Sequence, residues 1–168
     1  MLKFNVLHLL VAGGALGAVA TQWREANGRS LTSSRLFMAP LLAVAAAFLL
    51  LALAAPQSRE PALWVIGLAA GLTVGAARGV LLPLQVDRLW ERLRLPRTRD
   101  GLWVASLLGA LALAAFGAEL IPADLPWGDM LEIAASTAAA ACAGFLAGRA
   151  GSLWLRALRA PHSTWRDR

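Results

Sequence analysis

The chain has little of what soluble enzymes and disulfide-linked secreted proteins depend on. Of its 168 residues, one is cysteine, two are histidine and only 15% are charged. A single cysteine, Cys142, excludes an intrachain disulfide, and we expect a buried apolar thiol. The topology inferred below separates His8 from His162, so we expect no metal site and no haem ligand pair within one chain. Catalytic motifs and phosphate-binding loops are absent too, which predicts no enzymatic activity, no catalytic residue and no cofactor.

Apolar residues make up 58% of the sequence and are concentrated in five blocks. A helix needs about 20 apolar residues to cross the hydrocarbon of a bilayer. The blocks do not alternate strictly between apolar and polar residues, which argues against a membrane β-barrel. We therefore predict an all-α membrane protein, one integral domain over 1–168, with a bundle of five transmembrane helices. The expected spans are 2–21, 36–55, 62–84, 101–119 and 131–150.

The basic residues sort by connecting segment. Thirteen of the 16 lysines and arginines follow the first, third or fifth span: Arg24, Arg29, Arg35, Arg88, Arg92, Arg94, Arg97, Arg99, Arg149, Arg156, Arg159, Arg166 and Arg168. Positively charged segments stay in the cytoplasm, so the N-terminus is expected outside and the C-terminus inside a bacterial inner membrane. The net charge of +6 then predicts anionic lipid headgroups as partners and no nucleic acid.

Two cytoplasmic segments show an amphipathic pattern. The stretch "VDRLWERLRLP" places Val86, Leu89, Trp90 and Leu93 at helical spacing. This pattern predicts a short amphipathic helix within 85–96, lying in the headgroup layer. The basic tail, 151–168, repeats the pattern.

A row of glycines marks the third span. In "GLAAGLTVGAARG", every fourth residue is glycine: Gly67, Gly71, Gly75 and Gly79. Small residues at this spacing let two helix backbones approach closely in a membrane. We therefore predict a helix-packing face and expect the third span to be the most enclosed helix.

Arg78 stands beside this row, inside a span, where a charge is costly. One interpretation is that it extends to the cytoplasmic interface or pairs structurally. The other is that Arg78, Arg35 and Arg149, at similar depth, form a basic pocket for an anion or a lipid headgroup. Positive-inside sorting alone would also account for Arg35 and Arg149. We expect the Arg78 guanidinium to be enclosed by helices and hydrogen-bonded to a carboxylate, a backbone carbonyl or a headgroup.

The basic loop "WREANGRSLTSSRLFMAPLL" leads into a span with an early proline, and "GLAAGLTVGAARG" and a charged segment with Trp90 and Trp103 follow. In this arrangement, residues 22–115 resemble the CcdC-like group of small polytopic bacterial membrane proteins. That group is linked by name to cytochrome c biogenesis. The resemblance implies a bacterial inner-membrane location and no particular activity.

Two classes of function fit these features. The first is a non-enzymatic accessory or assembly protein that packs laterally against itself or a larger membrane complex, favoured by the glycine row and the short loops. The alternative is a small transporter or channel for an anionic or small solute, favoured by Arg78 and by a faint repeat. In that repeat, "SRLFMAPLL" and "RDGLWVASLL" enter spans two and four, and "GAARG" and "AGRAG" end spans three and five.

Overall fold

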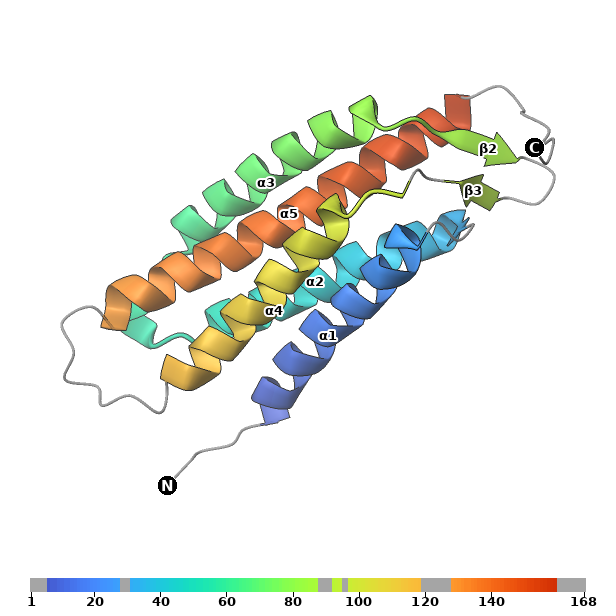
Figure 1. Cartoon of the computed structure of the whole chain (residues 1–168). Helices are drawn as coiled ribbons and strands as arrows, with labels where there is room; N and C mark the ends of the chain where they lie inside the picture. Colours follow the sequence, from blue (N-terminus) through green and yellow to red (C-terminus); the bar gives the residue numbers. More distant parts are fainter. Residues whose placement is uncertain (1–5, 28–30, 88–91, 95–96, 119–127, 160–168) are drawn as a thin grey trace.

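The structure is a computed structural model, and it describes residues 6–27, 31–87, 92–94, 97–118 and 128–159. Within these ranges, five long helices form one bundle (Figure 1). They are α1 (Val6–Ala26), α2 (Met38–Leu53), α3 (Pro61–Leu81), α4 (Asp100–Ala118) and α5 (Gly128–Arg159). Two 3-10 turns, η1 (Ser33–Phe37) and η2 (Pro56–Ser58), flank α2. Each helix, with α2 counted from Ser34, is long and apolar enough to cross a membrane, which confirms the predicted five-helix bundle.

Two helices extend beyond the predicted spans. The first continues past residue 21 to Ala26, and the fifth continues past residue 150 to Arg159. Apolar composition limits a span, but a helix continues wherever its polar residues find partners in the fold. The last turn of α1 is one such place, because Gln22 and Glu25 are both buried there. The remainder of the predicted basic tail, 160–168, lies outside the described residues.

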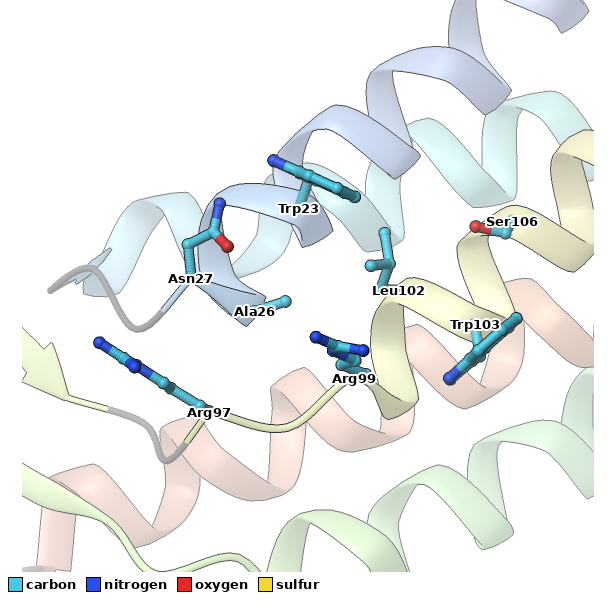
Figure 2. A pocket seen from close by; sticks show the side chains of 8 residues that line it. All are labelled: Trp23, Ala26, Asn27, Arg97, Arg99, Leu102, Trp103 and Ser106. Carbon is cyan, nitrogen blue, oxygen red and sulfur yellow. The ribbon is translucent and has the colours of Figure 1, made fainter.

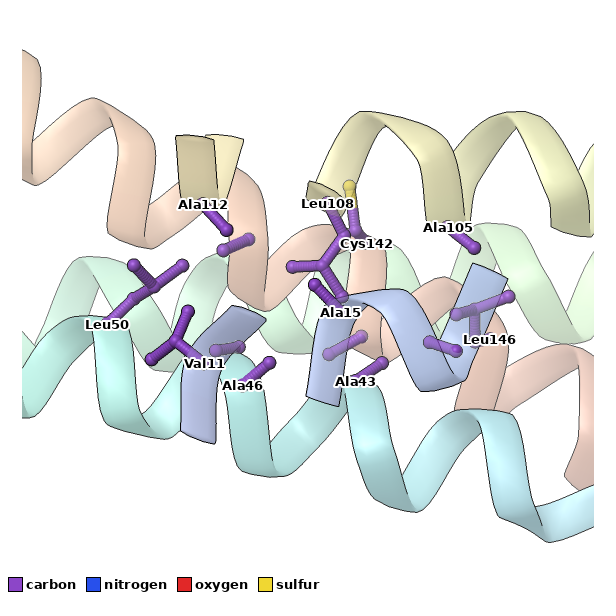
Figure 3. Packing of buried hydrophobic residues seen from close by; sticks show 14 residues of the cluster. Val11, Ala15, Ala43, Ala46, Leu50, Ala105, Leu108, Ala112, Cys142 and Leu146 are labelled. Carbon is purple, nitrogen blue, oxygen red and sulfur yellow. The ribbon is translucent and has the colours of Figure 1, made fainter. Parts of the chain in front are cut away.

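The centre of the bundle is an apolar cluster built from α1, α2, α4 and α5. Small side chains dominate it, so the four helices pack closely (Figure 3). Its fully or almost fully buried members are Val11, Ala15, Ala18, Ala43, Ala46, Ala47, Leu50, Ala105, Leu108, Ala112, Ala139, Cys142, Ala143 and Leu146. Cys142 is a buried free thiol, as predicted.

The glycine row of α3 lies directly against α5. All four of its members are buried: Gly67, Gly71, Gly75 and Gly79. A Cβ atom at Gly71 would overlap the carbonyl oxygen of Ala141. The fit is reciprocal, because a Cβ atom at Gly144 of α5 would overlap the carbonyl oxygen of Leu68. The packing face predicted from the row therefore meets a helix of the same chain.

The expectation that the third span is the most enclosed helix is wrong. The buried share of the membrane-spanning stretch is 22% in α3 and 39% in α5. The glycines form one narrow stripe, and α3 packs mainly against α5 along it. Its other sides carry large apolar residues that are exposed in the isolated chain, such as Val65, Ile66 and Val74. The central helix is α5, which also contacts α2 and α4.

A small antiparallel sheet replaces the predicted amphipathic helix. Its strands are β1 (Leu31–Thr32), β2 (Gln85–Asp87) and β3 (Arg92–Arg94), in the order β1-β3-β2. The helix predicted within 85–96 is therefore wrong for the described residues, whereas 88–91 and 95–96 lie outside them. The sequences Gln-Val-Asp and Arg-Leu-Arg each place an apolar residue between two polar ones, which is the period of a strand. Leu93 is buried in a second apolar cluster beneath the sheet.

The helices alternate in direction, so the sheet and one end of every helix lie together (Figure 1). This end, called the basic end below, carries most of the described arginines: Arg24, Arg35, Arg78, Arg92, Arg94, Arg97, Arg99, Arg149, Arg156 and Arg159. The opposite end carries η2 and the start of α5. The segments that hold the sorted basic residues thus share one end of the bundle.

Candidate functional site

A buried ion pair joins α1 to α5 at the basic end. Nη2 of Arg149 lies 2.5 Å from Oε1 of Glu25, and the two side chains are 4% and 7% exposed. Nε2 of Gln22 donates a hydrogen bond to Oε2 of Glu25 at 3.0 Å. Arg149 also donates to Oε1 of Gln22 at 3.5 Å and to Oγ1 of Thr98 at 3.4 Å. These four residues, of which Thr98 is half-buried and the other three are buried, are called the buried cluster. The pairing of Glu25 with Arg149 makes their charges tolerable at this depth.

The packed face of α1 leads directly into this cluster. Its buried residues recur at alternating spacings of three and four: His8, Val11, Ala15, Ala18, Gln22 and Glu25. This is the repeat of a helix face that packs along a neighbouring helix. The face becomes polar in its last two members, so Gln22 and Glu25 are carried into the interior by the apolar residues before them. The sequence prediction overlooked Glu25, although extending this spacing past the apolar block would have found it.

The start of α4 closes over the buried cluster. A Cβ atom at Gly101 would overlap Oε1 of Gln22 and would stand 3.1 Å from Nη1 of Arg149. The absence of a side chain at Gly101 therefore allows the start of α4 to lie close to Gln22 and Arg149. Thr98, just before the helix, points toward the same interior group and accepts a hydrogen bond from Arg149.

Arg78 has a carboxylate partner at the surface of the bundle. Its Nε donates to Oδ2 of Asp100 at 2.5 Å, and the two side chains are 42% and 27% exposed. Asp100 is the first residue of α4, where the helix dipole also stabilises a negative charge. Arg78 is thus hydrogen-bonded to a carboxylate, as expected, but it is only partly enclosed, because α3 lies at the edge of the bundle.

The three arginines predicted to form an anion pocket have different surroundings. Arg149 is buried and ion-paired with Glu25, and Arg78 is paired with Asp100. Arg35 is exposed in η1 and forms no ion pair with the residues that the structure describes. The structure brings Arg78 and Arg149 to the same end of the bundle, but each has a protein carboxylate where the predicted pocket would have an anion.

Arg156 has a structural role at the same end. Its Nη1 donates to the carbonyl oxygens of Gly79 at 2.8 Å and Leu82 at 2.6 Å. These carbonyls belong to the last turn of α3 and its C-cap, which lack partners within the helix. The side chain of Arg156, from α5, therefore caps the C-terminal end of α3.

A cavity of about 710 Å³ opens between the C-terminal end of α1 and the N-terminal end of α4 (Figure 2). We call it the arginine–tryptophan cavity, and its lining residues are Trp23, Ala26, Asn27, Arg97, Arg99, Leu102, Trp103 and Ser106. Arg97 and Arg99 are exposed, and neither side chain is hydrogen-bonded or ion-paired to another described residue. From the sequence, both were counted only as charges that set the topology. Their position on either side of the inward-facing Thr98 could not be read from it.

Polar residues at the opposite end hold connecting segments in place. Oε2 of Glu132 accepts a hydrogen bond from the backbone N–H of Ala55 at 3.1 Å, and Ser58 donates to Asp129 at 2.9 Å. These contacts attach the α2–α3 connection to the start of α5. A smaller, mainly apolar cavity of about 280 Å³ lies nearby and is lined in part by His8.

No group of three or more histidine, cysteine or acidic residues suited to hold a metal ion occurs among the described residues. The resemblance of residues 22–115 to the CcdC-like group stays a prediction. In comparisons with known proteins, the chain matches no protein-family model, no curated protein and no solved structure.

Proposed function

We propose that the protein spans a bacterial inner membrane five times and acts as a non-enzymatic accessory or assembly protein. In this proposal the N-terminus is outside, the basic end is in the cytoplasm, and the bundle binds laterally to another membrane protein or a second copy of itself. The orientation is supported by the gathering of arginines at one end, since positively charged segments stay in the cytoplasm. At the opposite end, the described residues include acidic Glu60, Asp129 and Glu132 and a single arginine, Arg59.

The closed apolar centre of the bundle is the observation that best supports an accessory or assembly protein over a transporter. Val11, Leu108 and Cys142, from three helices, are buried there and fill the middle (Figure 3). Buried polar residues of the described chain lie toward the two ends: His8, Gln22, Glu25, Ser58, Ser136 and Arg149. Secondary transporters bind their substrate near the midplane, between helices with irregular or polar segments. A bundle filled with apolar side chains at that depth is better suited to binding another membrane protein through its outer surface than to passing a solute through its centre.

The glycine row does not supply the lateral binding surface, because α5 already covers it. Lateral binding would therefore use the outward faces of the helices. The outer sides of α3, which packs mainly against α5, offer exposed apolar residues for this purpose.

The alternative is a small transporter or channel for an anionic or small solute. One observation favours it, namely the arginine–tryptophan cavity at the basic end, where the side chains of Arg97 and Arg99 have no ion-pair partner among the described residues. A solute entering there would still have to pass the apolar centre, so this alternative requires a rearrangement of the helices.

Cross-linking in native membranes, followed by purification in a mild detergent, separates the two classes. We expect a discrete complex of fixed stoichiometry, with another membrane protein or a second copy, that is absent from membranes lacking the tagged chain. Purified protein in liposomes should then show no anion flux above that of empty liposomes. A monomer without partners that conducts anions would contradict the accessory class and support the transporter.

A further inference from the structure

The arginine–tryptophan cavity is lined by two positive charges, Arg97 and Arg99, that neither Glu25 nor Asp100 neutralises. Glu25 is paired with Arg149, and Asp100 is paired with Arg78. Each of these two carboxylates thus already has an arginine partner. Arg97 and Arg99 remain, exposed and without an ion-pair partner among the described residues.

The buried cluster holds these two arginines toward the cavity. Thr98, between them, points inward and accepts a hydrogen bond from the buried Arg149. Arg97 and Arg99 both line the cavity on the other side, where Figure 2 shows them facing the end of α1 that carries Asn27. The segment is thus anchored through Thr98, and both arginines beside it line the same cavity.

The other lining residues match the border between headgroups and hydrocarbon. Trp23 and Trp103 are both exposed, and tryptophan is enriched at membrane interfaces. Leu102, which precedes Trp103 in α4, adds an apolar side chain to the cavity wall. A ligand with a charged head and an apolar remainder would meet suitable groups at each of its ends.

We propose that Arg97 and Arg99 bind a phosphate mono- or diester, supplied by the headgroup of an anionic phospholipid of the cytoplasmic leaflet. Guanidinium groups offer paired N–H donors that match phosphate oxygens, and the Asn27 amide can donate a further hydrogen bond. The cavity, at about 710 Å³, is in the size range of small-ligand sites and leaves room for the polar group esterified to the phosphate. The lipid source rests on the proposed membrane orientation, whereas the phosphate chemistry does not.

Lipid binding to the purified protein in detergent micelles tests the site. Native mass spectrometry would follow added phosphatidylglycerol, with zwitterionic phosphatidylcholine as the lipid control. We expect one phosphatidylglycerol to be retained by the wild type, and its affinity to fall about thirtyfold in Arg97→Gln/Arg99→Gln. The matched variant Arg35→Gln/Arg159→Gln removes the same charge from exposed arginines of the basic end outside the cavity, and it should bind like the wild type. Equal loss in both double variants, or no loss in the first, would overturn the proposal.

Competition with glycerol phosphate distinguishes the two sources of phosphate. Displacement of the lipid at millimolar concentration would identify a soluble phosphate ester as the ligand of the same arginines, and resistance to displacement would identify the lipid. Arg97→Lys/Arg99→Lys keeps the charge and provides a second test should the glutamine variant fail to fold. Weaker binding by this variant supports paired guanidinium donors, whereas wild-type binding contradicts them. Because the measurement is made in micelles, it can succeed even where the proposed orientation or accessory role fails.

Discussion

Oε1 of Glu25 and Nη2 of Arg149 meet at 2.5 Å, although they belong to the first and last helices of the bundle. The contact requires α1 to continue beyond its apolar block, and it places an acid and a base where each is almost fully buried. Through Thr98, the same arginine also holds the segment that leads into α4. Arg149 therefore joins α1, α5 and the segment before α4 at the basic end.

Removing one member of the Glu25–Arg149 pair should be costly. We expect Glu25→Gln to lower the free energy of unfolding by about 3–5 kcal/mol, because it leaves a buried guanidinium without its counter-charge. Equilibrium unfolding in detergent measures this loss, with Glu60→Gln, an exposed acid at the opposite end, as the control. The double variant Glu25→Leu/Arg149→Met should be more stable than Glu25→Gln. Wild-type stability of Glu25→Gln would show that the pair is not buried in the folded protein.

A methyl group on the glycine row should force α3 away from α5. At Gly71 it would overlap the backbone of Ala141, which cannot move aside as a flexible side chain could. We expect Gly71→Ala to reduce the free energy of unfolding by about 1–3 kcal/mol. Gly109→Ala in α4 is the matched control, since nothing lies within 4 Å of a Cβ atom there. That control should be neutral or stabilising by about 0.5–1 kcal/mol, and equal effects at both positions would contradict the close α3–α5 contact.

Arg78 and Arg149 should respond differently to lysine. Arg78 is partly exposed and has one carboxylate partner, so Arg78→Lys should change the free energy of unfolding only slightly. Arg149 contacts three partners through its guanidinium, and a lysine cannot reproduce this geometry. Arg149→Lys should therefore lower stability clearly more than Arg78→Lys in the same unfolding assay. The reverse order would mean that Arg78, and not Arg149, is the enclosed arginine.

The cap that Arg156 provides should be visible as local protection of α3. We expect Arg156→Met, which replaces the charged group by an apolar side chain, to speed amide hydrogen exchange in the last turn of α3 and at its C-cap, residues 79–82. The expected loss is about 1.5 kcal/mol of local stability, typical of hydrogen bonds from a charged group. Arg159→Met removes an exposed arginine from the end of the same helix and should leave this turn unchanged. Unchanged exchange in Arg156→Met would contradict the cap.

The five helices and the glycine contact were accessible from the sequence because they depend on local patterns. The length of an apolar block indicates where a membrane-spanning helix begins and ends. Glycines spaced four residues apart mark a stripe along one helix face. What the row could not reveal was its partner. Gly144 and Gly148 complete the contact from α5, and choosing them among the small residues of an alanine-rich chain requires knowledge of the tertiary arrangement.

The basic end was harder to predict because its residues are linked across the chain. Helical spacing in 85–96 competed with a strand period, and pairing with β1, far away in the sequence, favoured the strands. The candidate anion residues were chosen by depth in a span, which does not show whether a carboxylate stands nearby. Glu25 is ion-paired with Arg149, and Asp100 is ion-paired with Arg78. Arg97 and Arg99, which the sequence did not single out, are the arginines that line the arginine–tryptophan cavity.

Cysteine labelling in intact bacterial cells tests the proposed membrane orientation most directly. In a Cys142→Ala background, single cysteines would be introduced as Ser34→Cys at the basic end and Gln57→Cys at the opposite end, both at exposed positions. With a maleimide that cannot cross the inner membrane, we expect Gln57→Cys to be labelled in intact cells and Ser34→Cys only after the membrane is permeabilised. Labelling of Ser34→Cys but not Gln57→Cys in intact cells would reverse the orientation, and labelling of both would contradict a bundle that spans the membrane.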